Sequence, residues 1–204
     1  MTVRGLLVDF GGVLTTDVFA SFDTFCAAEG LAPGTVKELF RTDPRARELL
    51  AGLEDGTIAD GEFERGFAAL LGVPPDNLIE RLLGNAGLAT AMVGAVRAAR
   101  AHGIRTGLVS NSWGVDRYDR VLLAELFDGV VISAEVGYRK PAPEIYALGA
   151  RSVGLDPGAC VYVDDLPGNL KPARELGMTT LHHRDAPTTI AALSDLFGRS
   201  LAAP

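Results

Sequence analysis

Short apolar segments recur along the chain, and polar residues follow each of them directly. The four clearest are Val3–Val8, Ile104–Val109, Val130–Ser133 and Cys160–Val163. A fifth, Thr179–His182, follows Gly177. The runs are continuous and do not alternate between apolar and polar residues, which is typical of strands in a parallel sheet that helices cover on both faces.

Segments with helical periodicity separate these strands. They are Leu88–Ala101, Val115–Leu126, Glu144–Val153, Leu170–Leu176 and Thr188–Phe197. Strands that alternate with helices predict right-handed βαβ crossovers and therefore a doubly wound α/β fold. Ligands of such folds bind beyond the carboxyl ends of the strands, so the polar residues found there should converge on one crevice.

One region between Thr16 and Gly87 breaks this alternation, because its pattern is helical only. Its pieces are Val18–Glu29, Gly34–Arg41, Pro44–Ala51, Asp60–Leu71 and Pro75–Leu83. In the fourth piece we expect Asp60 to be the N-cap and Glu62 to add a favourable charge in the first turn. The chain should thus consist of an α/β core, residues 1–15 and 88–204, with a helical insertion, residues 16–87.

The first polar cluster, Asp9 to Thr15, follows the first strand. Gly11 and Gly12 lie beside Asp9, and because glycine has no side chain, a ligand can approach this carboxylate closely. By itself the cluster fits an active site and an aspartate-capped turn equally well.

The other three clusters differ in how strongly they indicate a site. Ser110-Asn111-Ser112 offers hydroxyl, amide and backbone N–H groups, which suit either an anion site or an ordinary helix cap. Lys140 precedes a helix, and a single lysine is usually solvated. Asp164 and Asp165 are adjacent carboxylates at the end of a buried strand. Their repulsion is costly unless a cation offsets it, so this pair favours a metal site.

Taken together, a carboxylate nucleophile, an anion site, a lysine and an acidic pair at successive strand ends predict phosphoryl transfer. In this order Asp9, Ser110, Lys140 and Asp164-Asp165 resemble the four motifs of the haloacid dehalogenase (HAD) superfamily, whose core is Rossmann-like. The helical insertion resembles the small C1 cap of that superfamily and is called the cap below.

Two longer stretches carry a closer likeness. VGYRKPAPEIY and VYVDDLPGNLKPARELGMTTL resemble the phosphatase domain at the N-terminus of soluble epoxide hydrolases. They also resemble related domains fused to some acyl-CoA dehydrogenases. The resemblance implies a phosphoric monoester hydrolase.

The family mechanism implies a role for each residue at the predicted anion site. Asp9 would attack phosphorus and form an aspartyl-phosphate that water then hydrolyses. Ser110 and the backbone of Asn111 would hold the phosphoryl oxygens. Lys140 would neutralise charge near Asp9 and the phosphoryl group, and so act in both binding and catalysis.

The resemblance also implies Mg²⁺ as the cofactor. Its protein ligands would be the Asp9 carboxylate, the Gly11 carbonyl and Asp165, with waters completing an octahedron. Asp164 and Asn169 would support these ligands from behind.

Gly11 departs from the family pattern, because most phosphatases of this family carry there a second aspartate that acts as general acid and base. Loss of such help typically costs about 10²–10⁴-fold in rate. The enzyme would then use leaving groups that need little protonation, use another donor, or retain only vestigial catalysis. Thr15, Thr16 and Asp17 are near in sequence, although Asp17 is more typical of a surface carboxylate.

Two alternatives stay open at this stage. One is a non-catalytic domain that binds a phosphorylated ligand. The other is a metal-independent 2-haloacid dehalogenase, since those relatives also lack the second aspartate and Arg41, Arg45 or Arg47 would grip a carboxylate. Dehalogenases do not generally keep an acidic pair like Asp164-Asp165, which argues against this second alternative.

Composition narrows the class of protein and partner. Of 204 residues, 48% are hydrophobic and 22% charged, which is typical of a globular chain, and the net charge of −7 argues against nucleic acid or an anionic membrane as partner. No apolar stretch approaches the ~18 residues of a membrane span. Asp9 interrupts the apolar N-terminal run, and no A-x-A cleavage site follows it. We therefore expect a cytoplasmic monomer or homodimer that acts on a small phosphorylated molecule.

Overall fold

The computed structural model describes residues 2–202 and contains one five-stranded parallel sheet. The strands are β1 (Gly5–Val8), β2 (Arg105–Ser110), β3 (Gly129–Ile132), β4 (Cys160–Asp164) and β5 (Thr179–His182). Their order in the sheet is β3-β2-β1-β4-β5, and every pair of neighbours is parallel. The predicted doubly wound α/β fold is thereby confirmed.

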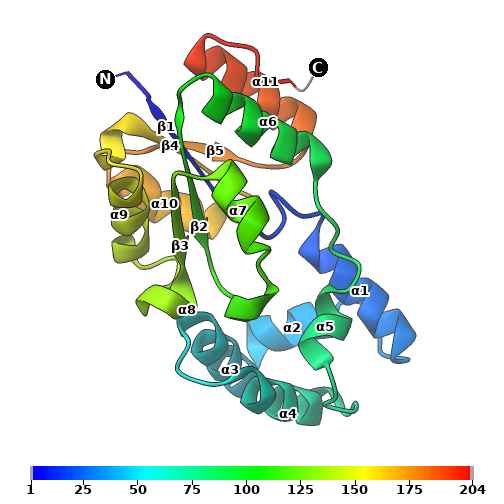
Figure 1. Ribbon diagram of the computed structural model, residues 1–204. Coiled ribbons are helices and arrows are strands. Elements are labelled where there is room, and N and C mark those ends of the chain that lie inside the picture. The colour runs from blue at the N-terminus through cyan, green and yellow to red at the C-terminus, as the bar shows by residue number, and fades with distance from the viewer. Residues whose placement is uncertain (1, 203–204) are drawn as a thin grey trace.

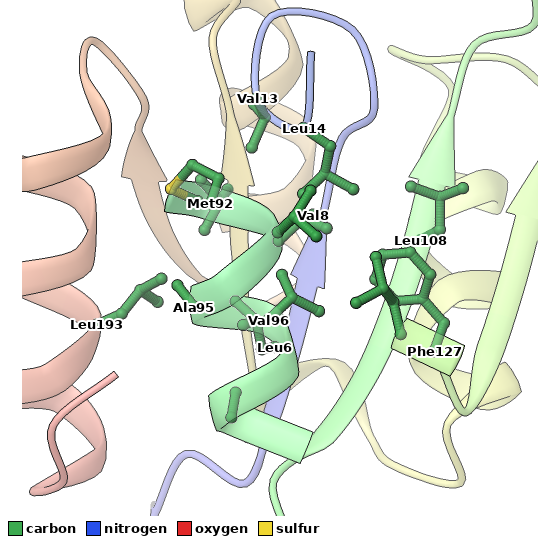
Figure 2. Close-up of a cluster of buried hydrophobic side chains, with 14 of the residues drawn as sticks. Leu6, Val8, Val13, Leu14, Met92, Ala95, Val96, Leu108, Phe127 and Leu193 are labelled. Atoms are coloured by element: carbon green, nitrogen blue, oxygen red, sulfur yellow. The ribbon is translucent and has the colours of Figure 1, made fainter. Parts of the chain in front are cut away.

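Helices cover both faces of this sheet (Figure 1). On one face lie α6 (Thr90–Ala101), α7 (Arg120–Leu126) and α11 (Ala186–Phe197). Figure 2 shows Met92, Ala95 and Val96 of α6 pointing at Leu6 and Val8 of β1 within this layer. On the other face lie α9 (Pro143–Ser152) and α10 (Pro167–Glu175), whose apolar residues form a second buried cluster with β1, β2 and β4. Because β1 is covered on both faces, all four of its residues are buried, as its continuous apolar sequence predicts.

The strand order reverses beside β1. From β1 the chain builds outward through β2 and β3, then crosses to the opposite side of β1 to form β4 and β5. The loops after β1 and β4 therefore diverge at the carboxyl end of the sheet, where open α/β sheets bind their ligands. Asp9 N donates to Val163 O at 2.9 Å, which keeps these two strand ends together.

The cap consists of five helices gathered at one end of the sheet (Figure 1). They are α1 (Val18–Ala28), α2 (Thr35–Thr42), α3 (Pro44–Asp55), α4 (Asp60–Leu71) and α5 (Leu78–Leu83). Their apolar faces share a separate buried cluster, rich in phenylalanine. The segments that enter and leave the cap run side by side and form an antiparallel bridge between Thr15 and Leu88. These features support the predicted division at residues 16–87, which as a domain boundary stays a prediction.

Several element bounds differ from the sequence prediction for local reasons. The predicted helix 115–126 is divided into a 3₁₀ turn, Val115–Arg117, and α7, because the Asp119 side chain accepts from Val121 N and Leu122 N and starts a new helix. Helix α10 begins at Pro167, a residue suited to a first turn. A second 3₁₀ turn, Pro157–Ala159, precedes β4.

Two predictions about helix starts and strand ends were wrong. Asp60 is not the N-cap of α4: Ala59 occupies that position, and Asp60 lies with Glu62 in the first turn, where both carboxylates still favour the helix dipole. Ser133, expected to end a strand, begins the short helix α8 (Ser133–Val136), which stops at Gly137 in the left-handed region (φ 73°). No helix within residues 2–202 has the length and apolar character that crossing a membrane requires.

Candidate active site

Most of the predicted strand-end residues line one cavity of about 440 Å³ at the carboxyl end of the sheet, and Asp164 lies buried behind them. Asp9 follows β1, Ser110 ends β2, and Asp164 ends β4. Lys140 lies in the loop between α8 and α9. The predicted residues that line the cavity are Asp9, Gly11, Ser110, Asn111, Lys140, Asp165 and Asn169.

Lys140 is the buried cation of this site. Its Nζ lies 2.7 Å from Asp9 Oδ1 and 2.9 Å from Asp164 Oδ2. Burial alone would lower the pKa of this ammonium group, but the carboxylates of Asp9 and Asp164 together raise it above its ordinary value. Lys140 therefore stays charged at neutral pH, and it is not the solvated surface lysine that its sequence position alone would suggest.

Asn111 holds the backbone of Lys140 through both ends of its side-chain amide. Lys140 N donates to Asn111 Oδ1 at 2.8 Å, and Asn111 Nδ2 donates to Lys140 O at 3.2 Å. The loop that carries Lys140 is thus fixed to the end of β2. Because the Asn111 side chain is engaged in this way, its backbone is the part suited to meet a phosphoryl oxygen.

Asp9 and Asp165 are the carboxylates that line the cavity at the strand ends. Oxygens of Asp9, Asp164 and Asp165 lie within 4.8 Å of one another. Burial, opposed by Lys140, raises the pKa of Asp9 to about 7. Burial and the charge of Asp164 raise the pKa of Asp165 to about 6. Both pKa values are raised first by burial and then by the neighbouring carboxylates, and a bound cation would lower both costs.

Asp164, in contrast, is saturated by protein partners. It accepts from Lys140 Nζ, from the Tyr162 hydroxyl, from Leu166 N at 2.8 Å and from Asn169 Nδ2 at 3.0 Å. It is also fully buried. This arrangement fits the supporting position expected for Asp164 and Asn169: Asn169 donates to Asp164, and Asp164 holds Lys140.

Gly12 is required by the approach of Asp165. Its φ is +70°, and a Cβ built on it would lie 2.4 Å from Asp165 Oδ2. Any side chain would displace the carboxylate, so this glycine admits Asp165 to the site. Oxygen ligands are the donors that Mg²⁺ prefers, and the Asp9 and Asp165 carboxylates with the Gly11 carbonyl make a donor set that fits the ion.

Ser110 is paired with Tyr118, a residue that the sequence analysis did not single out. Ser110 Oγ lies 2.9 Å from the Tyr118 hydroxyl, and both side chains are buried. Burial raises the pKa of Tyr118 to about 12, so its hydroxyl remains protonated. No motif marks Tyr118, because it comes to Ser110 through the turn that divides the predicted helix 115–126.

The cap supplies an apolar wall opposite these polar groups. The cavity residues of this wall are Val18, Phe19, Phe22, Phe40, Leu50, Leu83, Ala86 and Trp113. Trp113 follows β2, but its ring packs into the cap cluster, with its centroid 5.7 Å from that of Phe22 and 6.0 Å from that of Phe40. Trp113 thus both lines the cavity and joins the core to the cap.

Glu54, in the last turn of α3, is the cap's carboxylate in the cavity lining, and the sequence analysis missed it. Its Oε2 lies 2.9 Å from Arg139 Nη1, and its backbone oxygen accepts from the Ser133 hydroxyl. Burial raises the pKa of Glu54, and Arg139 opposes that rise. The contact spans 85 positions of sequence, so no local pattern could reveal it.

Other candidates from the sequence lie elsewhere. Arg41 and Arg45 are exposed and pair with glutamates of their own helices, Arg41 with Glu38 at 2.6 Å. Neither these two nor Arg47 is among the cavity-lining residues of the described chain. None of the three arginines that the dehalogenase alternative named is therefore placed to bind a substrate carboxylate in this cavity.

The three candidates for a replacement proton donor also separate. Asp17 caps α1, accepting from Phe19 N at 2.8 Å, and Thr16 Oγ1 donates to Asn85 O. Of the three only Thr15 lines the cavity, and its hydroxyl donates to Thr16 O while it accepts from Gly12 N.

Curated relatives share parts of this chain. The rat protein named bifunctional epoxide hydrolase 2 is 34% identical over 114 residues, which cover 52% of this chain and 21% of the relative. Mouse acyl-CoA dehydrogenase family member 10 is 32% identical over 109 residues, which cover 52% and 10%. A glyceraldehyde 3-phosphate phosphatase of Methanopyrus kandleri is 34% identical over 89 residues, or 42% and 38%. The matched region covers about a fifth of the epoxide hydrolase relative. It covers less than half of each of the other two relatives.

Solved structures share the fold over most of the chain. A HAD family enzyme of Bacteroides thetaiotaomicron aligns with a TM-score of 0.71 and 24% identity, covering 90% of this chain and 95% of that one. The wild-type form of that enzyme in complex with magnesium and inorganic phosphate aligns with a TM-score of 0.66, 23% identity and coverage of 89% and 94%.

The sequence pattern of haloacid dehalogenase-like hydrolases matches residues 3–177, most of the chain. This match confirms the family that the four motifs indicated, and the relatives confirm the likeness to the epoxide hydrolase and acyl-CoA dehydrogenase proteins. The chain belongs to the haloacid dehalogenase-like hydrolase family and is a hydrolase.

Proposed function

We propose that this hydrolase is a Mg²⁺-dependent phosphatase that acts on a small phosphorylated metabolite through an aspartyl-phosphate on Asp9. The observation that carries the proposal is the buried Lys140, 2.7 Å from Asp9 Oδ1 and 2.9 Å from Asp164 Oδ2, at the floor of the cavity. A fixed cation beside a carboxylate nucleophile suits an incoming dianion, because it offsets their repulsion without having to reorganise.

The reaction has two steps on one carboxylate. In the first, a carboxylate oxygen of Asp9 attacks phosphorus and the bond from phosphorus to the substrate oxygen breaks. Lys140, Ser110 and the backbone of Asn111 hold the phosphoryl oxygens during this transfer. In the second, water attacks phosphorus and the bond to the Asp9 oxygen breaks, which returns its electron pair to the carboxylate. Phosphate leaves with one proton of the water, and the other proton passes to solvent.

Magnesium would be held by the carboxylates of Asp9 and Asp165 and by the Gly11 carbonyl. It would supply neutralisation of charge on the phosphoryl oxygens and on the crowded carboxylates. The raised pKa values of Asp9 and Asp165 support this assignment. The magnesium and phosphate in the B. thetaiotaomicron enzyme support it by analogy.

The phosphatase relatives support the reaction class. For the substrate, we propose only that it is a small molecule. The 440 Å³ cavity suits a small molecule rather than a polymer. A cytoplasmic location and a monomeric or dimeric state remain predictions from the sequence.

The test is hydrolysis of p-nitrophenyl phosphate with and without Mg²⁺, in the natural chain and in Asp9→Asn. We expect metal-dependent turnover that Asp9→Asn abolishes, because asparagine keeps the shape but is a poor nucleophile. Trapping of beryllium fluoride with Mg²⁺, observed as a rise in Tm of the natural chain, provides a second readout. Binding of phosphate or beryllium fluoride without any turnover would instead establish the non-catalytic phospholigand-binding domain.

A further inference from the structure

The chemistry of the cavity walls indicates what leaves the phosphorus. Resting on the proposed function, we propose that the substrate is a phosphate monoester of a flat aromatic alcohol, a phenol or an enol-like heteroaromatic hydroxyl. Such an oxygen departs as a stabilised anion and needs no proton from the enzyme.

The first argument is the direction of departure. In phosphoryl transfer the attacking and leaving oxygens lie roughly in line. With Asp9 on the floor of the cavity, the leaving group therefore points toward the cap. On that side most of the lining is apolar, from Val18, Phe19, Phe22, Phe40 and Trp113. The charged residues Glu54 and Arg117 also belong to the cavity lining.

The second argument is the set of acids within reach. The carboxylates that line the cavity are those of Asp9, Asp165 and Glu54. In the proposed function Asp9 is the nucleophile and Asp165 a metal ligand. Glu54 is paired with Arg139 at 2.9 Å. Beside Asp9, Gly11 has no side chain, and a Cβ there would meet only a Val18 methyl group, at 3.4 Å. The place from which a donor would act is therefore apolar.

The third argument is the cost of leaving without a proton. The pKa of a phenolic hydroxyl is about 10, whereas that of water is about 15.7 and aliphatic alcohols resemble water. An aryloxide is therefore a far better unassisted leaving group than an alkoxide. The absence of an unpaired carboxylic acid at Gly11 costs little for an aryl phosphate and about 10²–10⁴-fold for an alkyl phosphate.

The fourth argument is the shape of the wall. The Trp113 ring lies tilted or edge-on to Phe22 and Phe40, with centroids 5.7 and 6.0 Å away. Phe40 is itself stacked on Phe67 at 4.5 Å, which fixes its orientation. Rings held by other rings make a rigid surface on which a flat aromatic group can stack or dock edge-on. A flexible chain would lose more conformational freedom there.

The experiment compares four phosphates on the natural chain with Mg²⁺. They are 4-methylumbelliferyl phosphate (flat, good leaving group), acetyl phosphate (small, good leaving group), n-octyl phosphate (apolar, poor leaving group) and glycerol 3-phosphate (polar, poor leaving group). We expect kcat/KM for the aryl ester to exceed that for the octyl ester at least about 100-fold, mainly through kcat. It should exceed that for acetyl phosphate at least about 10-fold, mainly through KM.

A matched pair of variants tests the missing donor directly. Gly11→Asp introduces a carboxylic acid where φ lies outside the left-handed region and a Cβ would meet only Val18, at 3.4 Å, and Gly11→Asn is its isostere without the acid. The ratio of octyl to aryl activity should rise at least about 10-fold in Gly11→Asp relative to Gly11→Asn. The inference would be overturned if the octyl-to-aryl ratio were equal in the two variants and the natural chain already hydrolysed the octyl ester as fast as the aryl ester.

The outcomes also separate this inference from the proposed function. Turnover of acetyl or octyl phosphate that matches turnover of the aryl ester overturns the substrate class while the phosphatase assignment stands. If Glu54→Gln lowered turnover of octyl phosphate in a pH-dependent way and left turnover of the aryl ester unchanged, Glu54 would be the proton donor. That result would also overturn the inference. Failure of all four phosphates, together with no beryllium fluoride binding, would overturn the proposed function and the inference with it.

Discussion

The cavity has two sides that different forces hold together. We call the polar side at the strand ends, with Asp9, Lys140 and Asp165, the floor, and the apolar side, with Phe22, Phe40 and Trp113, the roof. On the floor, which the strand ends and their loops supply, buried charges pair directly, and Lys140 lies between Asp9 and Asp164 at 2.7 and 2.9 Å. On the roof, supplied largely by the cap, phenylalanine and tryptophan rings meet one another. Under the proposed function, electrostatics would position the phosphoryl group, whereas shape and apolar contact would select what is attached to it. The proposal therefore predicts that chemistry and selectivity can be perturbed separately.

The largest effect should come from the floor, through Lys140→Met. Removing the cation leaves Asp9 and Asp164 buried without their partner, which should lower the free energy of unfolding by about 3–5 kcal/mol. Turnover of p-nitrophenyl phosphate should fall about 10²–10³-fold, because a fixed charge at the phosphoryl group is lost. Urea unfolding and steady-state kinetics measure the two effects.

Lys171→Met is the control for that variant. Lys171 is exposed and lies 3.8 Å from Glu175, so its loss should change the unfolding free energy by less than about 0.5 kcal/mol. If Lys140→Met were no more harmful than Lys171→Met, the floor would not depend on its buried ion pairs.

The roof should respond next, through Trp113→Ala. This change removes the ring that joins core and cap, and should cost about 2–4 kcal/mol of stability because the ring is half-buried. KM for an aryl phosphate should rise about tenfold with a smaller change in kcat. Trp113→Phe, which keeps a ring, should recover most of both quantities. A large fall in kcat with unchanged KM would show that the roof acts on the chemistry itself.

A pH series without metal should expose the strain on the floor. The pKa of Asp9 is raised to about 7 and that of Asp165 to about 6. The folded chain then holds more protons than the unfolded chain between about pH 4 and 7. The free energy of unfolding should therefore fall as pH rises through this window, and level off above it.

Added Mg²⁺ should reverse this loss where the carboxylates are ionised. At 100 times its Kd, the ion should stabilise the fold by about 2.7 kcal/mol near pH 8 and by much less near pH 5. Thermal unfolding measures both series, and Asp165→Asn, which removes a ligand, should flatten the Mg²⁺ response. A response of equal size at both pH values would place the ion away from these carboxylates.

The smallest effect is expected for Arg41→Ala on the outer face of the cap. The Arg41–Glu38 pair is solvent-exposed, so stability should change by less than about 0.5 kcal/mol. Turnover of p-nitrophenyl phosphate should stay within about twofold. A large rise in KM would mean that the cap's outer face takes part in binding, contrary to the separation of floor and roof.

Much of the floor could be predicted from the sequence, because three of its residues have a local signal. Asp9, Ser110 and Asp164 come directly at the ends of apolar runs, and parallel strands bring such ends together. Their roles in catalysis and metal binding are proposals that the geometry supports.

The roof and the junction could not be predicted in the same way. Phe22 and Phe40 carry the ordinary periodicity of core residues, so nothing local distinguishes a cavity wall from a packed interior. Tyr118 reaches Ser110 only because Asp119 interrupts a helix, and Glu54 meets Arg139 only after the cap has folded onto the core. These positions depend on tertiary structure, which periodicity does not encode.

The two segments that join the cap to the core, residues 14–16 and 87–89, lie side by side. This arrangement affects how the cap can change in evolution. Thr16 N donates to Gly87 O at 2.7 Å and Ala89 N donates to Leu14 O at 2.8 Å, so the chain leaves the core and returns to it at one place. A segment whose two ends already meet can be lengthened, shortened or exchanged without altering the register of the sheet. Grafting a different cap between Thr15 and Leu88 should therefore yield a folded chain with the same reaction centre and a different choice of substrate.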